Sequence, residues 1–202
     1  MKKLLYLILL IPSILYAEGI TYKTDIKAKR YNSVAKKQLE TDFHIEYYEE
    51  RENIVIFYKE IVKNNALFLT RKQADDLISA IEKYESWHIK AVNKKVKLEK
   101  TIKELSVAYC GWKIGQSDWN FQVGNYKYEA IFSSESEKHH QFMLSFTKAT
   151  SSLNKFISHK PVTLYFEKSE AIKLKNALKK ENLASFLVDY KKKKALEDEE
   201  FK

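Results

Sequence analysis

The stretch from Arg71 to Ser106 contains neither glycine nor proline, and this uninterrupted segment constrains the fold more than any other feature of the chain. Thr70 and Gln73 have the spacing of a capping box, which marks the start of a helix. A mostly apolar stripe then follows alternating steps of four and three, and only His88 and Lys95 interrupt its apolar character. Its members are Leu77, Ile81, Tyr84, His88, Ala91, Lys95, Leu98, Ile102 and Leu105. That period predicts one long helix over about 71–106. The alternative is two shorter helices with a break near Trp87 or Asn93.

Runs with a period of two flank this predicted helix. Phe43, Ile45 and Tyr47 alternate with polar or half-polar neighbours, which is typical of a strand. We expect further strands at 54–62 and 66–69, with a tight turn at Asn64–Asn65. These three strands form a predicted antiparallel β-meander.

The second β region lies at 107–166 and is followed by another helix. We expect strands at 107–114, 119–123, 126–132, 142–146 and 162–166, with a hairpin turn at Gly124–Asn125. The helix starts near Ser169. The chain is therefore predicted to be an α+β protein of antiparallel β-meanders, each followed by an amphipathic helix.

Two strand–helix junctions resemble each other at an offset of 97 residues. Leu67, Ala74 and Leu77 in the first are matched by identical residue types in the second. One interpretation is a duplicated βββα unit. The other is that leucine and alanine at helical spacing recur in any amphipathic helix.

The first seventeen residues have the pattern of a secretory signal peptide. Lys2 and Lys3 precede an uncharged apolar run of Leu4–Tyr16, and the small residue Ala17 precedes Glu18. We predict cleavage between Ala17 and Glu18. The run is shorter than the roughly 20 residues that a spanning helix needs, so an uncleaved anchor or a buried N-terminal helix is the weaker alternative. No cysteine follows Ala17 to accept a lipid.

The predicted organisation follows from these patterns. The parts are a signal peptide at 1–17, a polar lead-in segment at 18–41, a first β-meander with the long helix at 42–106, a second β region with its helix at 107–190, and a charged tail at 191–202.

The net charge of the chain and the motifs that its sequence lacks limit the classes of function to consider. The chain has 36 basic and 27 acidic residues, a net charge of +9 that becomes +7 without residues 1–17. Such a balance favours solubility, or contact with anionic polymers or lipid headgroups. Zinc-protease, calcium-loop, phosphate-loop and nucleophile-elbow motifs do not occur in the sequence, and we expect no metal or cofactor.

Two groups of residues remain as candidates. Cys110 is the only cysteine, so it is either a buried apolar residue or a free thiol, with His139 or His140 as its partner if it is catalytic. Trp112, Trp119, Tyr126 and Tyr128 lie in the densest aromatic stretch. They are either core residues or a surface that stacks on sugars or bases.

The sequence favours a non-enzymatic protein exported to the periplasm or secreted from a bacterial cell, with a binding or assembly role and an unknown protein or envelope polymer as partner. Self-association through the long helix is a further expectation. One alternative is a secreted polyanion- or nucleic-acid-binding module, although export disfavours nucleic acid. The second is an envelope hydrolase that uses a pair of carboxylates.

Overall fold

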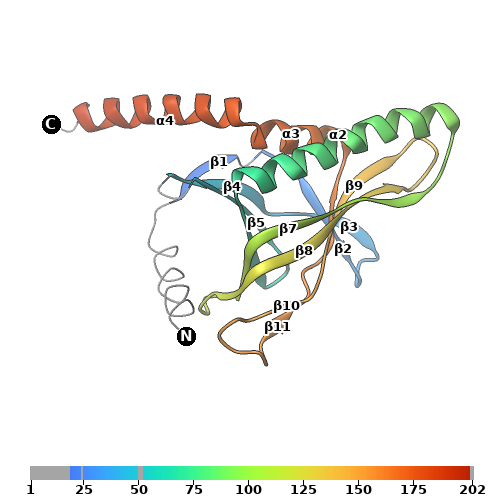
Figure 1. Cartoon of the computed structure of the whole chain (residues 1–202), viewed down its shortest axis with the longest axis horizontal. Coiled ribbons are helices and arrows are strands. Elements are labelled where there is room, and N and C mark those ends of the chain that lie inside the picture. The colour runs from blue at the N-terminus through green and yellow to red at the C-terminus, as the bar shows by residue number, and fades with distance from the viewer. Residues whose placement is uncertain (1–18, 24, 50–51, 201–202) are drawn as a thin grey trace.

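A computed structural model describes residues 19–23, 25–49 and 52–200 (Figure 1). The chain is an α+β protein, as predicted, with one large antiparallel sheet of ten strands and a separate two-stranded hairpin. The predicted signal peptide lies outside the described residues. Among the described helices, none combines the length and the apolar character needed to cross a membrane.

The strands of the large sheet, in chain order, are β1 (Ile20–Lys23), β2 (Ala28–Asn32), β3 (Lys37–Thr41), β4 (Phe43–Tyr48), β5 (Asn53–Lys59), β6 (Lys63–Leu69), β7 (Glu99–Ile114), β8 (Asn120–Ser134), β9 (His140–Phe146) and β12 (Leu164–Phe166). The small hairpin consists of β10 (Ala149–Thr150) and β11 (Ser158–His159). The helices are α2 (Arg71–Lys94), α3 (Lys168–Leu178) and α4 (Lys180–Glu200).

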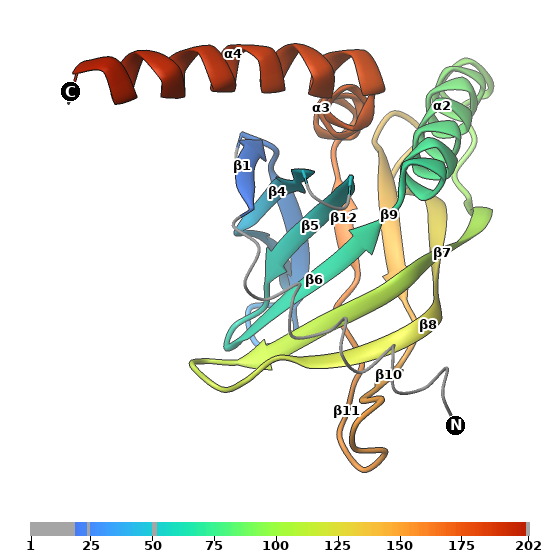
Figure 2. The ribbon, with the colours of Figure 1, turned by 60° about the vertical axis from the view of Figure 1, so that its left-hand side comes forward.

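The large sheet curls because one chain segment belongs to both of its ends. The strand order is β1-β4-β5-β6-β7-β8-β9-β12-β2-β3, and only Asp42 separates β3 from β4. The Asp42 carbonyl accepts a hydrogen bond from the Lys59 N–H at 3.0 Å, so the segment stays against β5. A sheet whose two ends are joined in this way is curved like a barrel, as Figure 2 shows.

The core fills the concave side of this sheet, beneath α2 and α3. The inward side chains of α2 are Ala74, Leu77, Ala80, Ile81, Tyr84 and Ala91, which confirms the first half of the predicted apolar stripe. The Tyr84 hydroxyl donates to the His140 carbonyl at 2.8 Å and ties α2 to β9. The capping box of Thr70 and Gln73 is also confirmed.

The predicted helix over 71–106 is wrong in its last third. Lys95 has a left-handed backbone with φ of 52° and caps α2, and residues from Glu99 onward belong to β7. The cause of the error is a β-bulge between Thr101 and Lys103. A bulge adds one residue to a strand, so Ile102 and Leu105 both reach the core at a spacing of three that resembles a helix.

A second bulge explains the error at Gly124–Asn125. Both residues have positive φ, as the hairpin prediction required, but they lie within the single long strand β8. The register between β7 and β8 shifts here, from Val107 opposite Tyr126 to Tyr109 opposite Val123. Extra residues with left-handed backbone are typical of bulges as well as of turns.

The predicted turn at Asn64–Asn65 is displaced by a few residues. The turn is closed instead by the Glu60 N–H, which donates to the Lys63 carbonyl at 2.7 Å, and Asn65 is a buried residue of β6. The polar segment 18–41, interpreted as a lead-in, contains β1, β2 and β3. The interpreted boundary at 106/107 falls inside β7.

The two similar junctions do occupy related places. Strand β6 runs into α2 and β12 runs into α3, and the two helices pack side by side. The similarity does not extend to the strand before each junction. The 97-residue offset places β5 on residues 150–156, which belong to the small hairpin and its loop.

A polar network fastens the β2–β3 edge to β9 and β12. The Glu167 carboxylate accepts hydrogen bonds from Lys29 at 2.8 Å and Gln141 at 2.9 Å, and pairs with His139 Nε2 at 2.7 Å. Burial alone would raise the pKa of Glu167, but these hydrogen bonds outweigh it and lower the pKa to about 2. The hydrogen bonds of His139 to Glu167 and Glu135 raise the pKa of the imidazole despite its partial burial.

The left-handed cap at Lys95 gives a first prediction. A non-glycine residue in this conformation costs about 1–2 kcal/mol, which glycine avoids at the expense of a more flexible unfolded chain. Lys95→Gly is therefore expected to raise the free energy of unfolding by about 0.5–1 kcal/mol, measured by urea denaturation. Lys90→Gly, inside the same helix, is the control and is expected to lower it. A lower unfolding midpoint for Lys95→Gly contradicts the assigned cap.

The His139 network gives a second prediction, on pH. Because the folded pKa lies above the unfolded value near 6.5, protonated His139 stabilises the fold fully below about pH 6.5, and this contribution is lost as the pH rises through the folded pKa. His139→Gln should therefore lower the free energy of unfolding more at pH 5.5 than at pH 9. Lys29→Gln removes another hydrogen-bond partner of Glu167 but leaves the His139 imidazole in place, and its effect should be similar at both pH values. Equal losses for His139→Gln at both pH values would refute the assignment.

Candidate functional site

The aromatic residues singled out in the sequence do not form one surface. Trp112, Tyr126 and Tyr128 are buried in the core. Trp119 is partly exposed on the convex face, where it packs beside Phe57 and Phe121. The structure therefore leaves Trp119 as the one member of the group with a ring that solvent reaches.

Cys110 is buried on the inner face of β7, and burial raises the pKa of its thiol to about 12. The histidines considered as its partners make other contacts. His139 bonds to Glu135 and Glu167, and His140 lies against His88. The geometry is that of a core thiol rather than an activated nucleophile.

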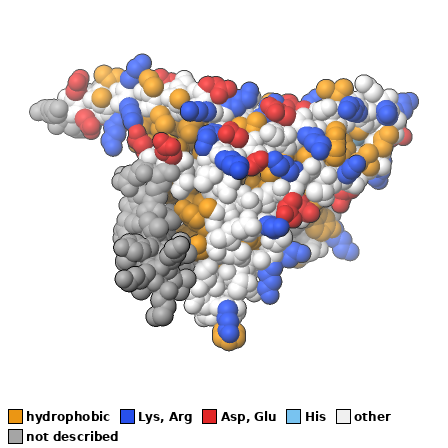
Figure 3. Space-filling view, in the orientation of Figure 1, with side chains coloured by type: hydrophobic (Ala, Val, Ile, Leu, Met, Phe, Trp, Pro, Cys, Tyr) orange, Lys and Arg blue, Asp and Glu red, His pale blue; other side chains and the backbone are white. Residues whose placement is uncertain are grey.

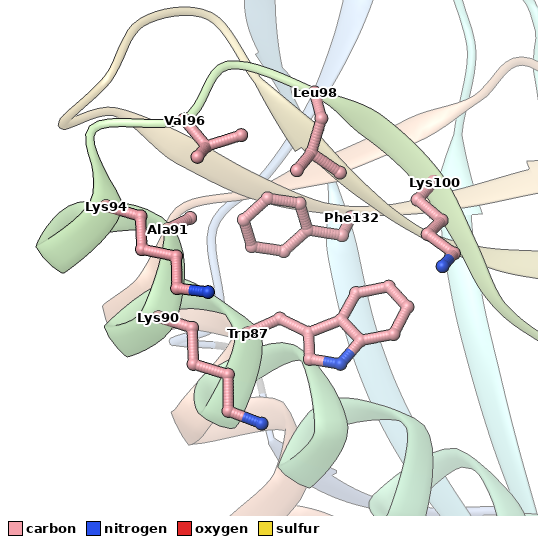
Figure 4. A pocket seen from close by; sticks show the side chains of 8 residues that line it. All are labelled: Trp87, Lys90, Ala91, Lys94, Val96, Leu98, Lys100 and Phe132. Atoms are coloured by element: carbon pink, nitrogen blue, oxygen red, sulfur yellow. The ribbon is translucent and has the colours of Figure 1, made fainter.

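The candidate site is a pocket under the C-terminal half of α2. The helix, the connection from α2 to β7, and the sheet border a pocket of about 260 Å³ that is open to solvent. Figure 3 shows apolar and basic side chains mixed over this part of the molecule. The lining residues are Trp87, Lys90, Ala91, Lys94, Val96, Leu98, Lys100 and Phe132 (Figure 4).

The walls of the pocket are apolar because three elements each turn an apolar side chain inward. Trp87 and Ala91 are four residues apart and lie on one face of α2. Val96 and Leu98 come from the connection, and Phe132 comes from β8. The Trp87 and Phe132 rings meet edge to face, with centroids 6.2 Å apart. The chamber suits an apolar group of modest size, since 260 Å³ equals about nine water-sized volumes.

The rim of the pocket is basic. Lys90 and Lys94 extend from α2 and Lys100 from β7, and the lining contains no carboxylate. The Lys100 ammonium lies 5.4 Å from the centre of the Trp87 ring, and that of Lys83 lies 5.1 Å from it. Within the described ranges, no carboxylate pairs with any of the three lining lysines. Their charge is therefore available to a ligand.

A histidine pair lies behind the pocket wall. The His88 and His140 Nδ1 atoms are 3.3 Å apart, and the His140 ring packs on Phe132 with centroids 5.1 Å apart. Burial lowers the pKa of both imidazoles, and nearby positive charge adds to this effect. Both rings are therefore neutral at neutral pH, so the positive charge of the site comes from lysine.

A second polar cluster, at the opposite end of the sheet, joins the β10–β11 hairpin to the β5–β6 turn. Glu60 Oε1 lies 3.0 Å from His159 Nε2 and accepts from the Asn65 amide at 3.2 Å, while Lys63 Nζ lies 3.0 Å from His159 Nδ1. Burial opposes ionisation of Glu60, but its hydrogen bonds with His159 Nε2 and the Val162 N–H, together with the nearby charge of Lys63, outweigh it and lower the pKa of Glu60. Both ring nitrogens of His159 are occupied, so the cluster has the character of a structural clasp.

The residues of the pocket were not predicted as a site. Trp87 was considered as the place of a helix break, and Ala91 and Leu98 as members of the apolar stripe. The sequence did contain one indication of a basic site, because Lys83, Lys90 and Lys94 surround Trp87 at helical spacing. Phe132 lies 45 positions beyond Trp87, and no local pattern connects the two.

Comparison with protein families, with curated proteins and with solved structures found no match to this chain. Among the residues the structure describes, no group of three or more histidine, cysteine or acidic side chains is placed to hold a metal ion. The arrangement under α2 can bind an apolar body and neutralise an anionic head. Its lining offers neither a carboxylate nor a nucleophilic hydroxyl or thiol.

Proposed function

We propose that this chain is an exported, non-enzymatic protein of the bacterial envelope that binds a small amphiphilic anion in the pocket under α2. The observation that carries the proposal is the combination of apolar walls with three lysines that lack carboxylate partners in the described chain. An apolar body is favoured in the chamber because it leaves water, and a carboxylate, sulfate or phosphate head is favoured at the rim.

The size of the chamber narrows the ligand class. Ligand pockets usually span about 300–1,000 Å³, so a cavity of 260 Å³ accommodates a short chain or a single ring rather than a whole phospholipid. A polyanion without an apolar part would contact the lysines but would leave the apolar surfaces of Trp87, Leu98 and Phe132 exposed to water. The pocket therefore favours an amphiphile over an extended polyanion.

Export is supported by the basic start, the apolar run and Ala17 at its end. When the full chain is expressed in a bacterium, the protein recovered outside the cytoplasm is expected to begin at Glu18. Edman sequencing or intact mass measures this directly. Replacing Ile8 and Leu9 with lysine interrupts the apolar run and should keep the chain in the cytoplasm. A recovered protein that still begins at Met1 would contradict the cleavage prediction.

The ligand class is tested by calorimetric titration with decanoate, decyl sulfate, decanol and decyltrimethylammonium. Decanoate and decyl sulfate should bind most tightly, and Lys100→Gln should weaken both about fivefold, since an exposed charge contact is worth about 1 kcal/mol. Val96→Trp should abolish binding by filling the chamber.

Lys97→Gln is the matched control for this titration. It removes the same charge from an exposed position in the connection between α2 and β7, three residues before Lys100, and Lys97 does not line the pocket. Equal weakening by Lys97→Gln and Lys100→Gln would refute the pocket as the site. Decanol binding as tightly as decanoate would refute the role of the lysine rim.

A further inference from the structure

Four loops meet at the end of the sheet that lies away from α2 and α3. They connect β2 to β3, β5 to β6, β7 to β8, and β10 to β11 (Figure 1). The Gly115 N–H donates to the Val62 carbonyl at 3.0 Å, so the second and third loops are adjacent. The His159–Glu60 contact holds the fourth loop beside the second, and one surface cavity is lined by residues 30–34 of the first loop together with 60–63.

This loop end carries most of the exposed large apolar side chains in the described part of the chain. Eight of thirteen such residues lie here, namely Tyr31, Val34, Ile61, Val62, Ile114, Leu153, Phe156 and Ile157. Val34 is 90% exposed and Phe156 is 87% exposed. Scattered apolar residues need no explanation, but their concentration at one end of a molecule marks an interaction surface.

The β10–β11 loop reaches furthest and has an ordered backbone. The Ser151 N–H donates to the Ile157 carbonyl at 2.8 Å, and the Ile157 N–H donates to the Asn154 carbonyl at 2.9 Å. The Asn154 side chain also accepts from the Phe156 N–H at 3.0 Å. These bonds hold Leu153 and Phe156 outward, at a position where they add nothing to the core.

Charge at this end is mostly positive. Lys148, Lys155 and Lys160 flank the tip, and the sequence from Lys148 to Phe166 contains no acidic residue. Lys36 and Lys37 lie at the β2–β3 loop. The acidic groups of this end are Glu60, which is held by His159, Asp42, which pairs with Lys59 at 3.7 Å, and Asp118. Figure 3 shows basic and apolar side chains together at the lowest point of the molecule.

We propose that the loop end docks on a lipid bilayer that contains anionic headgroups, with Leu153 and Phe156 inserted at the interface. Apolar tips on separate loops enter a fluid interface without needing one complementary shape, and flanking lysines meet the negative headgroups. A protein interface usually has a well-packed apolar centre, whereas Leu153 and Phe156 project from one loop and are 70% and 87% exposed.

The test is co-sedimentation with vesicles of phosphatidylcholine alone or with 30% phosphatidylglycerol. The chain from Glu18 onward is used, because it keeps every described strand and helix and omits the apolar run of residues 4–16. Binding should be markedly tighter to the anionic vesicles. The double variant Leu153→Ser, Phe156→Ser should weaken it at least tenfold, since each buried apolar side chain contributes strongly. Lys155→Gln should weaken it about fivefold.

Two matched variants provide controls for the vesicle test. Ile89→Ser, Val92→Ser removes two exposed apolar side chains from α2, and Lys193→Gln removes a charge from α4. Both variants should leave vesicle binding unchanged. Val96→Trp should also leave it unchanged, which would show that vesicle binding does not depend on the pocket. Equal losses in the loop and α2 variants would overturn the proposal.

Insertion itself is read from a fluorophore that responds to polarity. Cys110 is buried, so a cysteine introduced by Leu153→Cys is labelled selectively. Its emission should shift to the blue on anionic vesicles, whereas a label placed through Lys193→Cys should not shift. Sedimentation without a shift at position 153, or a shift at position 193 alone, would mean that another face binds the vesicle and would also overturn the proposal.

Discussion

Residues 37–48 form one nearly continuous extended segment that pairs with β2 through its first half and with β5 through its second. This double pairing sets the curvature of the whole sheet, because it brings the last strands of the order back to the first. A curved sheet has a concave side that must be filled, and α2 and α3 lie over it with their apolar faces inward. The position of α2, and hence the pocket beneath its second half, follows from that closure.

The closure also divides the molecule into two ends of different chemistry. At the helical end, the C-terminal half of α2 leaves a pocket beside the Trp87 and Phe132 rings that the core does not fill. At the loop end, turns of differing length leave their side chains outside any core, and the Glu60–His159 clasp fixes them relative to one another. Lysine is frequent at both ends, and the carboxylates near them are few or already paired.

Periodicity allowed the α+β class and most strand positions to be predicted from the sequence, and the spacing of Thr70 and Gln73 allowed the capping box to be predicted. Periodicity failed where a strand departs from a period of two. The bulge beside Ile102 imitates a helix, and the bulge at Gly124–Asn125 imitates a turn, because the local backbone is the same in each case. Strands β1–β3 were missed because they are polar and lie near the sheet's ends. The pocket was missed because it exists only after α2, its connection and β8 come together.

The two surfaces constrain each other. If the loop end faces a bilayer, α2 and the pocket face away from it (Figure 1). A ligand would then enter the pocket from water and not directly from the lipid phase. Such a route requires an amphiphile with appreciable aqueous solubility, which a short chain or single ring with a charged head has and a two-chain lipid lacks. The 260 Å³ pocket has room for an apolar group of the same modest size. Lysines that lack carboxylate partners in the described chain suit such a ligand, because their hydrated ammonium groups attract an anion at the rim without requiring it to lose all its water.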